Sequence, residues 1–309
     1  MLDKKWWDPS KKIVNHTKLE NISHIFQALS DQQLEMFGDG IFGRLLLVRQ
    51  IPNDDNKKHS TYPSRIVHQV MLRQCINTDY TVKKVDGKVT PCEAWFKINN
   101  HVVKYGLSEF ALMTGLNCRE FSPDELKEHN RSRDYTPKSM FAKKFFKKMK
   151  KVSTLEVLVS FLGARDATDN EKVMLAKLVF LETILLPKQD RSIINSRHLD
   201  IADNSEAFDN YPWGRVSYEN LMESITNCGD SLQKITTGYG VHGFSHALVA
   251  WAYEILPALA ENEYGICRNP NATPRVLRWQ FLYQGRCNSK GLVENVFENS
   301  EVNNIYRDS

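Results

Sequence analysis

The sequence predicts a mainly α protein, a single large helical domain with a small β-hairpin near residues 95–105. Apolar residues recur at helical spacing behind helix-start signals along most of the chain, and only one segment has two β-like runs joined by turn residues. We expect an N-terminal tail over residues 1–16, one domain over residues 17–282 and a loose C-terminal tail over residues 283–309. The charged stretch 119–139 is the only candidate break in this domain, because no linker rich in Pro, Gly or Ser divides it.

Helix-start signals predict several of the helices. A Ser or Thr followed three residues later by Glu can cap a helix, because each side chain accepts a hydrogen bond from the other residue's backbone N–H. Such capping boxes open apolar runs at three places: Ser122 with Glu125, Ser153 with Glu156, and Thr168 with Glu171. The third box opens a helix that is apolar on most of its circumference and stops at Pro187, so we place it at the centre of the core. Apolar spacing predicts two further helices, over residues 22–36 and 63–75.

The predicted hairpin consists of two β-like runs on either side of Asn99 and Asn100. Asparagine tolerates the positive φ that a tight hairpin turn requires. After the hairpin, we expect Ser108 to cap a short helix over residues 109–113. Gly115 can then end this helix in a left-handed conformation.

The composition is that of an ordinary soluble globular protein, with 41% hydrophobic and 25% charged residues. No apolar run approaches the roughly 20 residues that a membrane-spanning helix needs, so no membrane partner is expected. The first residues contain no apolar signal core, which predicts an intracellular protein. None of the six cysteines forms a Cys-x-x-Cys pair, so we expect six buried thiols in a reducing compartment rather than a zinc or redox site.

Positive charge is concentrated in one segment of the chain. Residues 127–151 contain ten Lys or Arg and two acidic residues, a local charge of +8 in a chain whose net charge is +4. A Thr136-Pro137 start signal and apolar residues at positions 141, 145, 149 and 152 predict an amphipathic helix over residues 138–151. The candidate contacts for an acidic partner, with weak non-specific nucleic acid binding as the first choice, are Lys143, Lys144, Lys147, Lys148, Lys150 and Lys151. A solvated outer face or a nuclear-import signal would have the same composition.

Two short motifs match the sequence pattern of a known functional site but lack the neighbouring elements or residues that the function requires. Residues 38–43 spell Gly-x-Gly-x-x-Gly, but a dinucleotide loop must follow a strand, and here a predicted helix precedes it, so we interpret the motif as a chain turn. His242 and His246 have the spacing of zinc ligands on a helix, but Gly243 stands where a zinc protease needs Glu. We therefore expect neither a metal nor a cofactor.

Cys228, within Asn-Cys-Gly-Asp-Ser-Leu, is the strongest candidate for a nucleophile. A reactive cysteine needs a cation or a helix N-terminus to lower its pKa, and a histidine base oriented by a carboxylate. His101 or His198 could serve as that base, but nothing in the spacing selects either of them. We interpret residues 227–232 as a helix-to-helix turn, predict no catalytic residue and expect that the protein is not an enzyme.

Several strings together resemble a known family. They are residues 41–43 (Ile-Phe-Gly), 95–101 (Trp-Phe-Lys-Ile-Asn-Asn-His), 105–118 (Tyr-Gly-Leu-Ser-Glu-Phe-Ala-Leu-Met-Thr-Gly-Leu-Asn-Cys), 211–218 (Tyr-Pro-Trp-Gly-Arg-Val-Ser-Tyr), 243–248, 254–257 and 278–279. In this order they resemble a plant domain of unknown function that precedes a SUMO-protease-like (ubiquitin-like protease) domain in many transposon-derived plant proteins. The resemblance covers residues 38–280, is most family-like over 38–220, and is most specific over 105–118.

The resemblance implies a non-catalytic binding or scaffold module, nuclear in location, with an unknown protein partner. The family has no established catalytic residue, cofactor or ligand, so none can be transferred to this chain. The alternative is a truncated relative of a SUMO-specific cysteine protease whose catalytic domain is absent from this chain. Function must then be argued from a site rather than from the fold.

Overall fold

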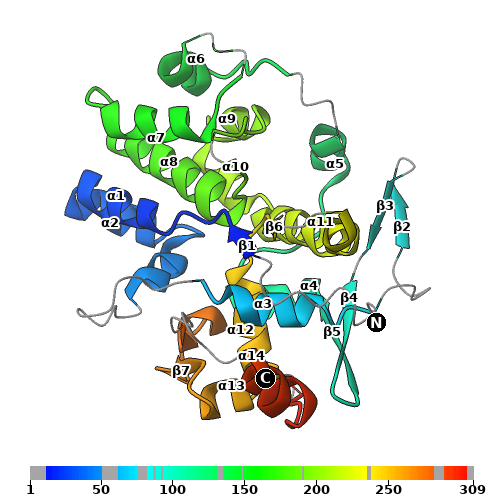
Figure 1. Ribbon diagram of the computed structural model, residues 1–309. Helices are drawn as coiled ribbons and strands as arrows, with labels where there is room; N and C mark the ends of the chain where they lie inside the picture. Colours follow the sequence, from blue (N-terminus) through cyan, green and yellow to red (C-terminus); the bar gives the residue numbers. More distant parts are fainter. Residues whose placement is uncertain are drawn as a thin grey trace. The chain divides into compact units, whose positions relative to one another are not determined.

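The computed structural model describes residues 12–50, 62–75, 82–85, 88–91, 93–130, 135–147, 149, 151–189, 191–234, 238–281 and 289–304 (Figure 1). Within these residues the protein is mainly α, and each of its sheets has two strands. The chain divides into two compact units. Unit 1 consists of Met1–Asn15, Gln50–Gly115 and Tyr218–Ser309, and unit 2 consists of His16–Arg49 and Leu116–Ser217.

This division differs from the one domain that the sequence predicts. Both units are assembled from separate stretches of the chain, and the expected break at 119–139 lies inside unit 2. Whether the two units unfold together as one domain stays a prediction, and limited proteolysis tests it by showing whether an isolated unit survives.

Unit 2 is built from helices. They are α1 (Glu20–Ala28), α2 (Asp31–Gly38), the 3₁₀ helix η2 (Gly43–Gln50), α5 (Pro123–Asn130), α6 (Met140–Phe146), α7 (Thr154–Gly163), α8 (Asp169–Phe180), the π-helical turn η3 (Leu181–Leu185), α9 (Arg197–Ile201) and α10 (Ser205–Asn210). Helix α8 packs against α1, α2 and α7 (Figure 1). Because its residues from Val173 to Phe180 are all buried, α8 forms the centre of this core, as predicted.

All three predicted capping boxes form. In each, the Ser or Thr hydroxyl accepts the backbone N–H of the Glu three residues later, and that carboxylate accepts the backbone N–H of the Ser or Thr. The box at Thr168 starts α8, and the helical backbone ends at Leu185, just before Pro187. Short-range capping chemistry was therefore a sound guide to where these helices begin.

The predicted helix over residues 22–36 is wrong, because two helices occupy this stretch. Leu29 has an extended backbone, and Ser30 then caps α2. The Ser30 hydroxyl accepts the backbone N–H of Gln33, while the Gln33 side chain accepts the backbone N–H of Ser30. This second capping box interrupts an apolar pattern that would otherwise continue.

The Gly-x-Gly-x-x-Gly motif forms the turn between α2 and η2, which confirms the prediction of a turn. The backbone N–H of Gly43 donates to the carbonyl of Gly40 at 3.0 Å. A Cβ atom on Gly43 would overlap the carbonyl of Gly38. The third glycine is thus required by a close approach of two backbone segments and not by a cofactor.

Unit 1 combines short strands with helices. They are β1 (Lys12–Asn15), α3 (Ser64–Met71), β2 (Val82–Val85), β3 (Lys88–Pro91), β4 (Glu93–Ile98), β5 (His101–Gly106), α4 (Leu107–Thr114), most of α11 (Trp213–Lys234), β6 (Gly238–Val241), α12 (His246–Ile255), α13 (Ala258–Glu261), β7 (Gly265–Cys267), the 3₁₀ helix η4 (Arg275–Arg278), β8 (Trp279–Phe281), α14 (Ser289–Leu292) and the π-helical turn η5 (Val293–Glu298). Helix α12 is buried along almost its whole length and packs on α3, α4 and η4.

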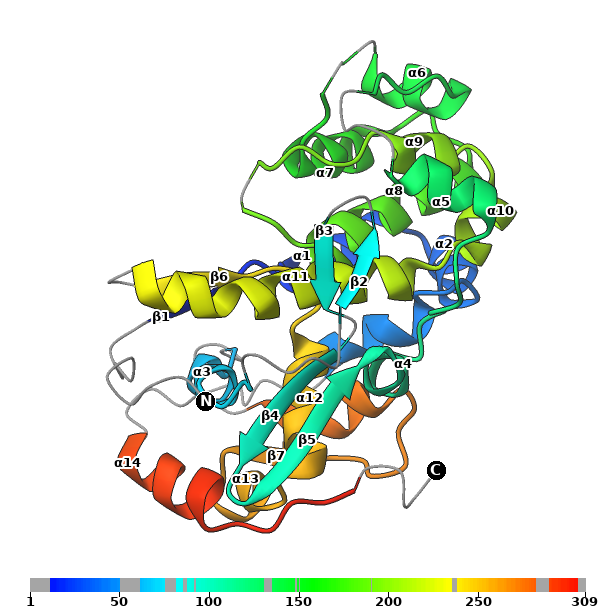
Figure 2. The same cartoon turned by 90° about the vertical axis from the view of Figure 1, so that its right-hand side faces the viewer.

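Strands β4 and β5 form an antiparallel pair with Ile98 opposite His101, and Figure 2 shows them side by side. Asn99 has a φ of 52°, in the left-handed region that a tight turn uses. The ring centroid of Trp251 on α12 lies 5.6 Å from that of Phe96 and 5.2 Å from that of Tyr105. The pair is therefore fixed to the core by aromatic contacts.

Helix α4 follows the hairpin directly and begins two residues earlier than predicted. Gly106 is its N-cap, and the Glu109 carboxylate accepts the backbone N–H of Gly106 at 2.7 Å, so Ser108 is not the cap. Gly115 ends the helix with a φ of 66°, as predicted.

The helix expected over 63–75 ends at Met71 because the following residues pair with β4. The backbone N–H of Cys75 donates to the carbonyl of Trp95 at 2.7 Å, and that of Lys97 donates to the carbonyl of Arg73 at 2.9 Å. These two hydrogen bonds extend the hairpin by a short third segment.

Residues of both expected tails form secondary structure that belongs to unit 1. Strand β1 pairs in parallel with β6, from Lys12 opposite Gly238 to Asn15 opposite Val241. Leu292, Val296 and Phe297 are buried, and the backbone N–H of Asn99 donates to the carbonyl of Phe297 at 3.2 Å. A few apolar residues at the right spacing outweigh the polar composition of the C-terminal segment.

Candidate functional site

The basic segment contains a shorter helix than the sequence predicts. Helix α6 begins after Ser139, whose hydroxyl accepts the backbone N–H of Ala142 at 3.2 Å. Thr136 does not cap it, because Asp200 on α9 accepts the backbone N–H groups of Lys138 and Ser139 at 2.9 and 2.8 Å and holds this stretch outside the helix. The helix ends at Phe146, since Lys147 has a φ of 33°.

The lysines of this segment have different surroundings. Lys143, Lys147 and Lys151 are exposed and form no ion pair with the described residues. The Nζ atom of Lys144 lies 2.6 Å from the Glu171 carboxylate. Lys148 and Lys150 lie outside the described residues. The structure therefore leaves three described ammonium groups that a partner could contact.

Unit 2 holds α6 in place through its apolar face, through α9 and through the turn that follows α9. Phe141 and Phe146 are buried, whereas Phe145 is half-buried and the predicted stripe residue Met149 is 39% exposed. The backbone N–H of Phe141 also donates to the carboxylate of Asp203 at 2.8 Å. Asp200 and Asp203 lie about sixty residues along the chain from α6, so no local pattern in the basic segment could have identified them.

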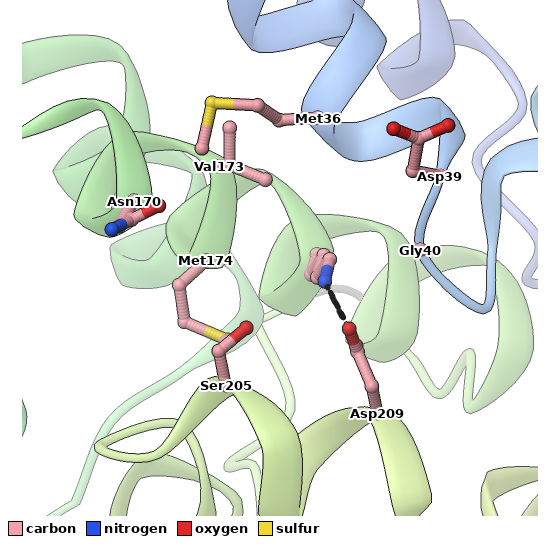
Figure 3. A pocket seen from close by; sticks show the side chains of 9 residues that line it. Met36, Asp39, Gly40, Asn170, Val173, Met174, Ser205 and Asp209 are labelled. Atoms are coloured by element: carbon pink, nitrogen blue, oxygen red, sulfur yellow. Dashed lines mark hydrogen bonds and ion pairs between the residues drawn. The ribbon is translucent and has the colours of Figure 1, made fainter.

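A small cavity of about 160 Å³ opens on unit 2 between α2, α8 and α10 (Figure 3). It is lined by Met36, Asp39, Gly40, Asn170, Val173, Met174, Lys177, Ser205 and Asp209. The Lys177 ammonium lies 2.8 Å from both carboxylate oxygens of Asp209, and the two side chains are 4% and 30% exposed. Because Asp209 neutralises this cation, the cavity presents no free positive charge to an anionic ligand, and we assign the pair a structural role.

His198, one of the two bases considered for Cys228, belongs to a buried pair in unit 2. Its Nδ1 atom lies 2.5 Å from Oε1 of Glu182, and both side chains are buried. The indole of Trp213 meets the imidazole edge to face at 5.0 Å. Both neighbours orient His198 within the core.

Cys228 lies inside helix α11 and is buried, so the predicted turn over residues 227–232 is wrong. Burial, and after it the interaction with Cys228, raises the pKa of the Tyr239 hydroxyl well above its ordinary value. That hydroxyl lies 3.2 Å from Nδ1 of His68, so unit 1 brings Cys228 close to a tyrosine, whereas His101 is an exposed residue at the start of β5. A mid-helix position also lacks the N-terminal dipole that activates a thiol.

The expectation of six buried thiols is met only in part. Cys228 is buried, Cys75 and Cys118 are half-buried, and Cys267 is exposed. Burial raises the pKa of the Cys118 thiol to about 12. Cys92 and Cys287 lie outside the described residues.

His246 is the first residue of α12, and His242 precedes the helix rather than sharing one of its faces. The His246 imidazole is packed among the rings of Tyr62, Phe244 and Phe281. Its Nδ1 atom has no hydrogen-bond partner among the described residues. These residues also contain no group of three or more His, Cys, Asp or Glu that could hold a metal ion.

The burial of His246 predicts that acid destabilises unit 1. Desolvation lowers the pKa of His246 from 6.5 to about 4, so the unfolded chain binds a proton more readily between these two values. Stability is therefore lost as the pH falls from 6.5 towards 4, by about 3 kcal/mol over the full window. Urea unfolding at pH 7 and pH 4.5 should show a smaller loss for His246→Leu than for the wild type. Equal losses would contradict this assignment.

The comparisons with known proteins identify one domain. A family model described as "Domain of unknown function (DUF1985)" matches residues 85–224. The matched part runs from the last residue of β2 through β3, β4, β5 and α4 of unit 1 and α5 to α10 of unit 2, and it ends within α11. It includes residues 95–101, 105–118 and 211–218, three of the strings that carried the resemblance. Searches of the curated proteins and of the solved structures found no match.

Among the described residues, no helix is both long enough and apolar enough to cross a lipid bilayer.

Proposed function

We propose that this chain is a non-catalytic binding or scaffold module of a transposon-derived nuclear plant protein, and that its basic segment contacts an acidic partner. The plant and transposon origin rests on the family resemblance, and the matched domain of unknown function supports that resemblance at the level of the domain alone. The nuclear location and the partner are parts of the same proposal.

The exposure of Lys143, Lys147 and Lys151 carries this proposal. Helix α6 is anchored by Phe141, Phe146 and the carboxylates of Asp200 and Asp203, so the first two ammonium groups extend from a fixed support. Lys144 should contribute less to the binding of an acidic partner, because its charge is already compensated by Glu171. A lysine ammonium binds phosphate as a point charge and makes no hydrogen bond that distinguishes one base from another. Nucleic acid binding at this segment would therefore not depend on the base sequence.

A salt titration tests the proposal. If Lys143, Lys147 and Lys151 each neutralise a phosphate of duplex DNA, the logarithm of the affinity should fall with the logarithm of the salt concentration at a slope of about −2.7. The triple variant Lys143→Gln, Lys147→Gln, Lys151→Gln should flatten this slope and leave the melting temperature unchanged, because all three side chains are exposed. Fluorescence anisotropy of a labelled duplex measures the affinity of the wild type and that of the triple variant.

A matched control separates this segment from net charge. Lys97, Lys127 and Lys290 are also exposed but lie on β4, α5 and α14, so changing these three to Gln removes the same formal charge elsewhere. Lys127 and Lys290 form surface ion pairs with Asp124 and Glu294, but their side chains remain 73% and 78% exposed, so both ammonium groups stay accessible to a partner. This control variant should retain most of the wild-type dependence of DNA affinity on salt concentration. Absence of DNA and RNA binding even at low salt would mean that the lysines form only a solvated face.

A second experiment addresses the protease alternative. A SUMO vinyl-sulfone probe modifies the catalytic thiol of a SUMO-specific cysteine protease. We expect no modification of this chain, because Cys228 is buried in the middle of α11. Covalent labelling at Cys228 would overturn the non-catalytic proposal.

A further inference from the structure

Helix α7 has apolar side chains on two opposite faces. Val157 and Phe161 are buried and face the core of unit 2. Leu155, Val159 and Leu162 are 42%, 59% and 47% exposed. We call these three residues the outer stripe.

The spacing of the outer stripe is that of a helix-packing surface. Its residues stand at positions i, i+4 and i+7, so they lie along one side of the helix over about 10 Å. The same 4–3 spacing forms the seam between two helices in coiled coils. Ten large apolar side chains are exposed among the described residues, and α7 alone supplies three of them. Grouped apolar exposure of this kind marks an interaction surface more often than single exposed residues do.

Both ends of α7 are held firmly. At the N-terminus, Ser153 and Glu156 form the capping box, and Ser153 also forms a β-bridge with Ile193, which is 47% exposed. At the C-terminus, the Lys172 ammonium donates to the carbonyls of Phe161 and Ala164 at 2.5 and 3.4 Å. A partner would therefore meet a stripe that is already ordered, which lowers the entropic cost of binding.

The exposed charged side chains on helix α6, which contacts α7, and just before and after α7 are mostly positive. Between residues 143 and 166, the exposed side chains that carry a charge and lack an ion pair within the described residues are Lys143, Lys147, Lys151, Arg165 and Asp166. Four of these are cations and one is an anion. An apolar stripe with such neighbours fits a partner that has apolar residues at its centre and acidic residues at its edges.

We propose that the outer stripe of α7 is a docking site for an acidic amphipathic helix of another protein. This goes beyond the function proposed above, because it concerns a protein partner and a surface made of apolar side chains. A second copy of this chain is a poorer occupant, since two such surfaces would bring their lysines together. The acidic helix would place its own apolar residues against Leu155, Val159 and Leu162 and its carboxylates towards Lys151, which precedes α7.

Binding of a designed peptide to the full chain tests this inference. The probe is a labelled helical peptide of about 20 residues with leucines at i, i+3, i+4 and i+7 and glutamates on both flanks. The triple variant Leu155→Gln, Val159→Gln, Leu162→Gln should weaken binding at least about tenfold. Its melting temperature and its DNA salt slope should match those of the wild type, because the changed side chains are exposed and uncharged.

The chain offers a closely matched control. Val102 on β5 is 58% exposed, against 59% for Val159, so Val102→Gln makes the same change in another place and should leave peptide binding unaltered. A peptide of the same composition in scrambled order, and one with Lys in place of Glu, should each bind at least about tenfold more weakly.

Three results would overturn the inference. The first is binding of the acidic helix that the triple variant leaves unchanged. The second is equal binding of the scrambled or the basic peptide. The third is wild-type self-association in sedimentation experiments that the triple variant abolishes, which would assign the stripe to a second copy.

Discussion

Replacing Trp213 by alanine is expected to lower the free energy of unfolding by about 3–5 kcal/mol, as is typical of a fully buried large aromatic residue. The indole is 1% exposed, and its ring centroid lies 4.5 Å from that of Tyr211 and 5.0 Å from that of Phe208. Its Nε1–H also donates to the carbonyl of Phe208 at 2.8 Å. Truncation would remove these ring contacts and leave the Phe208 carbonyl with only the backbone N–H of Tyr211, at 3.3 Å, as its donor.

A graded series separates these contributions. Trp213→Phe keeps most of the ring packing but loses the indole N–H, so it should cost about 1–2 kcal/mol. Urea unfolding followed by circular dichroism measures both variants. A cost below about 1.5 kcal/mol for the alanine variant would show that unit 2 can collapse around the missing ring. Trp213 lies in the Tyr-Pro-Trp-Gly-Arg string, so this series also tests whether that string is structural.

The second large effect is expected at the cavity of unit 2. Asp209→Asn should destabilise the protein by about 3 kcal/mol, because the ammonium of Lys177 would be left buried without a negative partner. The asparagine side chain has nearly the same shape, so packing changes little. Thermal or urea unfolding at neutral pH measures the loss.

The double variant Lys177→Met, Asp209→Asn is the control. It removes the buried charge as well as its partner, so it should recover most of the stability that Asp209→Asn loses. If the double variant is as unstable as the single one, the charge is not the cause. If the single variant costs less than about 1 kcal/mol, water in the adjoining cavity solvates the ammonium.

The parts of the fold that depend on neighbouring residues could be predicted from the sequence. Capping boxes, the central α8 and the left-handed Gly115 depend on residues within one or two turns of each other. The break at Ser30 was missed, although Ser30 and Gln33 have the spelling of a capping box, because the apolar pattern continued across it. The capping-box signal was present in the sequence, but the apolar periodicity over residues 22–36 favoured one continuous helix.

Other features could not be predicted because distant residues decide them. The start of α6 depends on Asp200, and the charge of Lys177 depends on Asp209. Gly229 and Asp230 suggested a turn after Cys228, but α11 continues to Lys234. The outer stripe has the same residue types as a core, and only the fold shows that Leu155, Val159 and Leu162 face solvent.

The pairing of β1 with β6 has a consequence for the order in which the protein folds during synthesis. All of unit 2 has been synthesised once residue 217 is made, so its core can form while the rest of the chain is still being translated. Unit 1 must wait, since Ser245 hydrogen bonds to Asn15 across 230 residues and the hairpin needs the carbonyl of Phe297. Until those residues arrive, the apolar sides of β1, α3 and the hairpin are exposed to other nascent chains. We therefore expect unit 1 to be the part of this protein that depends on chaperones, and slowing translation after residue 217 should prolong that dependence.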